Sequence, residues 1–109
     1  MSQQFDEIFD VLVIGSGCGG LTAALTADIA NPSKVLVVEK SHLIGGTSAT
    51  SGGVIWIPDN HLGKEKGAND SISEAKEYLR ATIPADEFNE PLIDTYLDQI
   101  KPMLKEGLV

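Results

Sequence analysis

The stretch that decides the fold is DVLVIGSGCGGLTAALTADIANPSKVLVVEK, which occupies residues 10–40 of the 109-residue chain. It begins with a short apolar run, residues 11–14, which is typical of a central parallel strand buried on both faces. A glycine-rich turn follows, and the alanine-rich sequence after it predicts a helix from Cys18 to Ala30. Pro32 ends this helix because proline cannot continue helical geometry. A second apolar run, residues 35–38, predicts a second strand.

The turn matches the pattern G-x-G-x-x-G with glycines at positions 15, 17 and 20. Gly15 permits a sharp exit from the strand, Gly17 lets a pyrophosphate approach the backbone, and Gly20 lets the helix pack closely on the sheet. The helix points its free N–H groups and the positive end of its dipole at the phosphates. Glu39 follows about 20 residues later and can accept hydrogen bonds from both ribose hydroxyls of an adenosine. Because a carboxylate repels a 2′-phosphate, the pattern predicts a dinucleotide site that disfavours an NADP-type cofactor.

The predicted helix has an apolar face. We expect the face toward the sheet to carry Leu21, Ala24, Leu25 and Ile29, because these residues recur at helical spacing. Neighbouring alanines would permit close approach to the strands.

A second glycine-rich stretch, GGTSATSGG at residues 45–53, has little bulk, many hydroxyl groups and no charge. Such a stretch lets backbone N–H groups and hydroxyls surround a bulky anionic ligand. The alternative is a flexible linker. The glycine-rich stretch lies between Glu39-Lys40 and the apolar residues 54–57, and this position favours ligand binding over a linker. This second loop argues against a simple NAD-binding module, which remains an alternative.

The residues around this loop carry a family resemblance. Glu39-Lys40 followed by Gly45-Gly46-Thr47-Ser48 resembles the FAD-binding start of glutathione-reductase-like flavoproteins, in the branch with fumarate reductase flavoproteins and 3-ketosteroid dehydrogenases. The run SGGVIWIPDN, residues 51–60, is similar to the ketosteroid Δ1-dehydrogenase pattern of S-G-G followed by W-I-P-x-N. Residues 75–79 and 96–104 resemble the helices after that motif. The resemblance covers nearly the whole chain.

The resemblance implies a flavin-dependent oxidoreductase that acts on CH–CH bonds and is 3-oxosteroid 1-dehydrogenase-like. In this family the flavin takes a hydride from one carbon while a protein base takes a proton from its neighbour. A fumarate reductase-like segment and a truncated, non-catalytic FAD-binding remnant are the alternatives. We assign no catalytic residue, since none matches either branch safely, and Arg80 is the only arginine available for a dicarboxylate. FAD is expected to be non-covalent because the loop at residues 45–53 contains no histidine.

The expected fold class is α/β: a partial Rossmann-like β-α-β FAD-binding unit followed by helices, which is an incomplete doubly wound domain. Two strands cannot cover both faces of such apolar runs, and residues 54–57 add one short strand at most. Residues 1–109 are therefore interpreted as a single N-terminal FAD-binding segment of a larger flavoprotein, with a helical extension at residues 71–108. An apolar substrate such as a 3-ketosteroid would bind through the missing domain.

Local signals define the helices of the extension. Ser71 to Glu74 form a capping box that opens a helix ending near Thr82. Asn89 is an N-cap candidate for the next helix, which has proline in its first turn. Pro102 is expected to kink or restart that helix. The apolar stripes of the two helices are expected to be core; they comprise Ile72, Ala75, Tyr78 and Leu79 in the first and Leu92, Ile93, Tyr96, Leu97 and Ile100 in the second.

One departure from the family pattern lies in residues 31–33, Asn-Pro-Ser, where relatives usually place a glycine. Asparagine tolerates left-handed geometry, but the proline restricts the turn. We therefore expect a small displacement of Glu39 that weakens its contacts with the ribose.

Composition restricts the partners. Sixteen acidic against eight basic residues give a net charge of −8, which argues against nucleic acid and anionic membranes as partners. No run of 18 apolar residues and no secretory leader are present, so the expected location is cytoplasmic. Cys18 is the single cysteine, and His42 and His61 have no partner at metal-binding spacing, so no metal site is expected. Trp56 is expected to be structural.

The predicted cofactor-binding residues are the glycines, hydroxyls and charged groups of the two loops and the second strand end: Gly15, Ser16, Gly17, Gly19, Gly20, Glu39, Lys40, Gly46, Thr47, Ser48, Ser51, Gly52 and Gly53.

Overall fold

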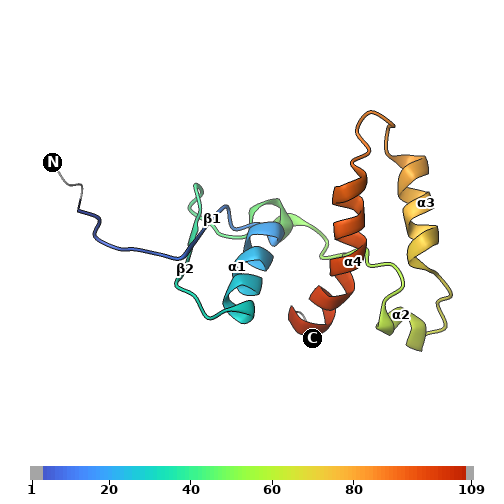
Figure 1. Ribbon diagram of the computed structural model, residues 1–109, viewed down its shortest axis with the longest axis horizontal. Coiled ribbons are helices and arrows are strands. Elements are labelled where there is room, and N and C mark those ends of the chain that lie inside the picture. Colours follow the sequence, from blue (N-terminus) through green and yellow to red (C-terminus); the bar gives the residue numbers. More distant parts are fainter. Residues whose placement is uncertain (1–3, 108–109) are drawn as a thin grey trace. The chain divides into compact units, whose positions relative to one another are not determined.

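The computed structural model describes residues 4–107, and the chain divides into two compact units, Met1–Val54 and Ile55–Val109. Figure 1 shows the elements of each unit. The first unit contains β1 (Val11–Ile14), α1 (Cys18–Ala30), β2 (Val35–Val38) and the 3₁₀ helix η1 (Gly46–Thr50). The second unit contains α2 (His61–Glu65), α3 (Ile72–Thr82) and α4 (Glu90–Gly107).

The first unit is built on a parallel pair of strands connected by a helix. β1 and β2 pair in parallel from Val11 opposite Val35 to Ile14 opposite Val38. α1 packs against both strands. The strand and helix bounds predicted from the sequence are therefore confirmed, as is the mixed α/β class.

One face of this two-stranded sheet is exposed in the chain. The side chains of β1 alternate between half-buried Val11 and Val13 and exposed Leu12 and Ile14, because successive residues of a strand point to opposite faces. The Ile14 side chain is 83% exposed. Burial on both faces, which the apolar runs predicted, is thus not reached within these residues.

The orientation predicted for α1 was wrong in part. Ala24 is half-buried, but Leu21, Leu25 and Ile29 are exposed. Apolar residues surround this helix on several sides, so their spacing did not single out the face that packs on the sheet.

The turn between α1 and β2 does not use left-handed geometry. Asn31 has φ −156° and ψ 104°, which is extended backbone, and its N–H caps the helix by donating to the Ala27 carbonyl at 3.2 Å. The strand register continues to Val38, whose carbonyl accepts from the Gly15 N–H at 2.7 Å. The strand pairing thus extends to the residue before Glu39, and the displacement of Glu39 expected from Pro32 stays a prediction.

Residues 54–57, from which at most one short strand was expected, do not form a strand. A strand needs a partner for its N–H and C=O groups, and these residues pair with no other strand in the part of the chain that the structure describes.

The second unit is a pair of long helices with a short one before them. α3 and α4 lie side by side and are connected by a turn (Figure 1). The core of this unit consists of Leu97, which is 2% exposed, with Ala75 and Ile57. Tyr78 and Leu92 belong to the predicted apolar stripes, yet both are exposed, at 59% and 65%. Two packed helices bury only the centre of each stripe.

The helix starts follow the predicted capping residues. The Ser71 hydroxyl accepts from the Glu74 N–H at 3.2 Å and α3 ends at Thr82. The Asn89 side chain accepts from the Leu92 N–H at 3.1 Å at the start of α4. Pro102 does not restart the helix, because α4 continues through it to Gly107. No helix within residues 4–107 combines the length and apolarity needed to cross a membrane.

Candidate functional site

The glycine turn after β1 has the geometry that its sequence predicted. Gly15 has φ +100°, a conformation that L side chains rarely adopt. Gly17 is the residue before α1, and its carbonyl accepts the first helical hydrogen bond, from the Leu21 N–H at 3.0 Å. A Cβ added to Gly20 would overlap the Gly15 carbonyl oxygen, so the close approach of helix and turn requires glycine there.

Ser16 connects this turn to Glu39 and to the second glycine loop. Its backbone N–H and its hydroxyl both donate to Glu39 Oε2, at 3.0 Å and 2.6 Å. The Ser16 Oγ also accepts from the Gly45 N–H at 3.0 Å. The Ser16 side chain is buried, with 1% of its surface exposed. The turn after β1, the end of β2 and the second glycine loop thus meet at one hydroxyl group.

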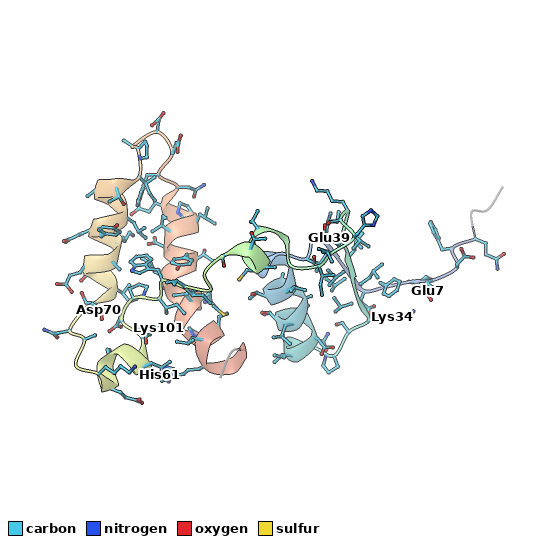
Figure 2. All side chains as sticks on the ribbon, turned by 180° about the vertical axis from the view of Figure 1, so that it is seen from behind. Glu7, Lys34, Glu39, His61, Asp70 and Lys101 are labelled. Atoms are coloured by element: carbon cyan, nitrogen blue, oxygen red, sulfur yellow. The ribbon has the colours of Figure 1, made fainter. Side chains whose placement is uncertain are left out.

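Glu39 follows β2 directly and points toward the glycine turn, whereas Lys34 precedes the strand at its opposite end (Figure 2). Its Oε1 accepts from the Ser41 N–H at 2.9 Å. The Ser16 hydroxyl, then the N–H groups of Ser41 and Ser16, lower the pKa of Glu39 from its ordinary value of 4.5 to about 2. The carboxylate is therefore ionised across the physiological range.

This environment limits what Glu39 can accept from a ligand. An ionised carboxylate has about four lone-pair positions. The N–H and O–H of Ser16 and the N–H of Ser41 occupy three of these. One position remains on Oε1, so accepting both ribose hydroxyls, as the sequence suggested, requires one of the internal contacts to be exchanged.

The second glycine loop lies against the start of α1. Gly45 and Gly46 have φ +107° and +54°, and η1 begins at the second of these. The Ser48 hydroxyl accepts from the Cys18 N–H at 3.0 Å. A Cβ on Gly46 would lie 3.4 Å from Gly17 Cα, so the two glycine loops are in close backbone contact.

The N-terminus of α1 is suited to a phosphate group. Its first turn contains no acidic side chain, and its N-cap residue, Gly17, provides no side-chain cap. Within the described part of the chain, the N–H groups of Gly19 and Gly20 have no hydrogen-bond acceptor. Free N–H groups at a helix N-terminus attract anions, and the absence of side chains on the glycines leaves the approach open. The residues present therefore suit a dinucleotide pyrophosphate.

The structure brings together only part of the predicted set. Gly15, Ser16, Gly17, Gly20, Glu39, Gly46 and Ser48 form the connected cluster. Ser51 is joined to it through its hydroxyl, which donates to the Ser48 carbonyl at 2.8 Å, and Gly53 donates to the Ser51 hydroxyl at 3.2 Å. Within residues 4–107 the side chains of Lys40 and Thr47 form no hydrogen bond or ion pair with the cluster, and Gly52 forms no hydrogen bond with it.

Sequence reasoning missed three contributors. Gly45, Ser41 and Cys18 each take part through a backbone N–H. A backbone contribution leaves no residue-type signal, except at Gly45, whose left-handed φ favours glycine. The described residues contain no group of three metal-ligating side chains.

Comparisons with known proteins identify the family of the chain. Residues 10–106 match the family described as "FAD binding domain". The chain is 48% identical over 96 residues to the 3-oxosteroid 1-dehydrogenase of Mycolicibacterium smegmatis, covering 88% of this chain and 16% of that protein. It is 55% identical over 73 residues to the 4-oxocyclohexanecarboxylate 2-dehydrogenase of Sinomonas cyclohexanicum, covering 67% and 12%.

A solved structure is also similar. It is the 3-ketosteroid Δ1-dehydrogenase of Sterolibacterium denitrificans in complex with 1,4-androstadiene-3,17-dione, with a TM-score of 0.75 and 41% identity over 89% of this chain and 16% of that one. The chain therefore spans about a sixth of the length of these relatives. The family match covers both glycine loops and Glu39 completely, and the chain belongs to the FAD-binding domain family.

Proposed function

We propose that the chain is the FAD-binding segment of a longer flavoenzyme that dehydrogenates a ring carbon–carbon bond of a 3-oxosteroid. The observation that supports FAD binding is the junction of two glycine loops at Ser16 and Glu39, beside the free N–H groups of Gly19 and Gly20. The family match names the cofactor. The names of the relatives support the substrate class.

In this proposal each part of the cluster has a role toward FAD. Glu39 accepts a ribose hydroxyl of the adenosine through Oε1, while the first turn of α1 and the Ser48 hydroxyl hold the pyrophosphate. The glycines let the cofactor approach the backbone. The binding is non-covalent. The remaining predicted residues contact the cofactor from before η1 (Lys40), within it (Thr47) and directly after it (Ser51, Gly52 and Gly53).

Bound FAD supplies the two-electron oxidation of the substrate. In this proposal the residues of this chain bind and orient the cofactor, and no catalytic role is assigned to them. The exposed sheet face around Leu12 and Ile14 supports the further proposal that the β1–α1–β2 unit belongs to a larger, Rossmann-like doubly wound domain. The substrate would then bind through other parts of the longer protein, and a cytoplasmic location stays a prediction from the sequence.

Titration of the flavin-free 109-residue chain by isothermal calorimetry tests the cofactor assignment. We expect FAD to bind, ADP to compete and FMN not to compete, because FMN lacks the adenosine that Glu39 recognises. Glu39→Gln should weaken FAD binding about tenfold, the effect of losing one charge-assisted hydrogen bond. Glu77→Gln, an exposed change on α3, is the matched control. Equal binding of FAD and FMN would contradict the assignment.

The substrate class is tested with the longer protein that contains this segment. A 3-oxosteroid, 4-oxocyclohexanecarboxylate and fumarate are compared as substrates, with an artificial electron acceptor or donor. Oxidation of the steroid is the expected result. Oxidation of 4-oxocyclohexanecarboxylate instead would favour the second candidate, which the 55% identity over 73 residues supports. Reduction of fumarate alone would overturn both.

A further inference from the structure

The Ser16 side chain is buried and hydrogen-bonded, and its position in a glycine turn does not by itself explain this burial. It is a polar side chain that is 1% exposed, in a unit whose loops are otherwise accessible. Both hydrogen-bonding capacities of its hydroxyl are in use. The Gly45 N–H is a donor, so the Ser16 Oγ accepts from it and must give its own proton to Glu39 Oε2.

We propose that Ser16 is a positioning residue whose buried hydroxyl holds the Glu39 carboxylate and the Gly45 end of the second glycine loop in their cofactor-binding places before the cofactor arrives. This inference rests on the proposed function only for the identity of the ligand. The arrangement itself is a property of the chain.

The Ser16 hydroxyl matters for the orientation of Glu39 because, in the part of the chain that the structure describes, no ion pair holds this carboxylate. Within the described residues Glu39 forms no ion pair, so no cation fixes its position. The nearest titratable side chains along the sequence are those of Lys40 and His42. Of the elements packed in this unit, β1, β2 and η1 carry no titratable side chain and α1 carries Cys18 and Asp28. Neutral donors, with Ser16 first, therefore keep the carboxylate ionised and oriented.

If the two glycine loops are ordered before FAD arrives, the affinity for FAD is higher. A ligand that orders a loop on binding must offset the entropy of ordering, whereas a prearranged loop costs less. In Ser16→Ala the backbone N–H at position 16 still reaches Glu39, but the hydroxyl donor to Oε2 and the acceptor for Gly45 are both lost. Glu39 and the second loop should then become independent of each other.

The first test needs no flavin. The pKa of the Glu39 side chain is measured by ¹³C NMR in the 109-residue chain, in Ser16→Ala and in the control Ser33→Ala. Within residues 4–107 the Ser33 hydroxyl forms one hydrogen bond, to the Asn31 carbonyl. We expect about 2 in the native chain and in the control, and a rise toward 4.5 in Ser16→Ala. Hydrogen exchange of the Gly45 amide should also accelerate in Ser16→Ala alone. A Glu39 pKa that Ser16→Ala leaves unchanged would overturn the proposal.

The second test measures FAD affinity at pH 7.5 and pH 4.5. We expect Ser16→Ala to weaken binding at both values, and by a further factor of about two to three at pH 4.5, where a Glu39 with a raised pKa is partly protonated. A change that merely loosened the fold would weaken binding equally at the two pH values, and that result would contradict the positioning role. If the native chain binds no FAD, the proposed function fails, and the first test still decides the arrangement of Ser16, Glu39 and Gly45.

Discussion

Gly20 lies so close to Gly15 that no side chain has room between them. A Cβ built on Gly20 would overlap the carbonyl oxygen of Gly15 and would lie 3.4 Å from Val13 Cγ1. This contact sets how closely α1 approaches the turn after β1, and hence where its free N–H groups lie.

Gly20→Ala should destabilise the first unit by about 1–3 kcal/mol, because the helix must move away from backbone that cannot yield. The measurement is hydrogen exchange of the Gly15 amide, which donates to the Val38 carbonyl at 2.7 Å. Gly19→Ala is the control for stability: no atom lies within 4 Å of its Cβ. It should be neutral or stabilising by up to about 1 kcal/mol. Similar effects of both substitutions would refute the steric explanation.

Tyr96→Phe should lower the free energy of unfolding of the second unit by about 0.5–1.5 kcal/mol. The Tyr96 hydroxyl donates to the Trp56 carbonyl at 2.6 Å, and the two rings stack with centroids 6.4 Å apart. Urea unfolding followed by the fluorescence of Trp56, the single tryptophan, measures the loss. Tyr78→Phe is the matched control, since that hydroxyl forms no hydrogen bond within residues 4–107. An equal loss in the control would show that the hydroxyl bond is not responsible.

Pro102→Ala should stabilise α4 by up to about 3 kcal/mol, because proline inside a helix lacks an N–H for the carbonyl four residues earlier. Pro91→Ala is the control, since Pro91 lies in the first turn of α4, where the N–H would have no helical partner. Hydrogen exchange of the amides at residues 103–105 reports the difference. Faster exchange in Pro102→Ala would mean that the ring contributes packing that outweighs the missing bond.

Asp59→Asn should remove part of the acid sensitivity of the second unit. Asp59 accepts from Lys101 at 2.7 Å and pairs with Lys64 at 2.6 Å, and the two lysines, Lys101 first, lower its pKa below 3.8. A lowered folded-state pKa gives stability that is complete above the unfolded-state pKa and is lost as pH falls through the folded-state pKa.

The native chain should therefore be more stable than Asp59→Asn at pH 7, and the difference should shrink below about pH 4. Asparagine suits the left-handed backbone at this position, where φ is 53°, so the substitution tests the charge and not the turn. Urea unfolding of native chain, Asp59→Asn and the exposed control Asp98→Asn at pH 7 and pH 3 provides the comparison. A difference that stays constant with pH would exclude the ion pairs as its cause.

The sequence by itself determined the elements whose causes are local. The apolar run of β1, the glycine that ends it, Pro32 after α1 and the Ser71 cap all act within a few residues, so the element bounds could be predicted. The G-x-G-x-x-G spacing and Glu39 also predicted that the glycine turn and the end of the second strand lie together, because a strand, a turn and a helix of these lengths leave few other arrangements.

Only the tertiary structure decided which groups meet. Ser16 is 23 positions from Glu39 and 29 positions from Gly45. No short-range sequence pattern predicts that the Ser16 hydroxyl forms hydrogen bonds with both residues. The same holds for the exposed Leu21 of α1, since an all-round apolar helix does not specify which face packs. Local chemistry fixes the elements, whereas the partners of a buried hydroxyl depend on chain segments that approach only after folding.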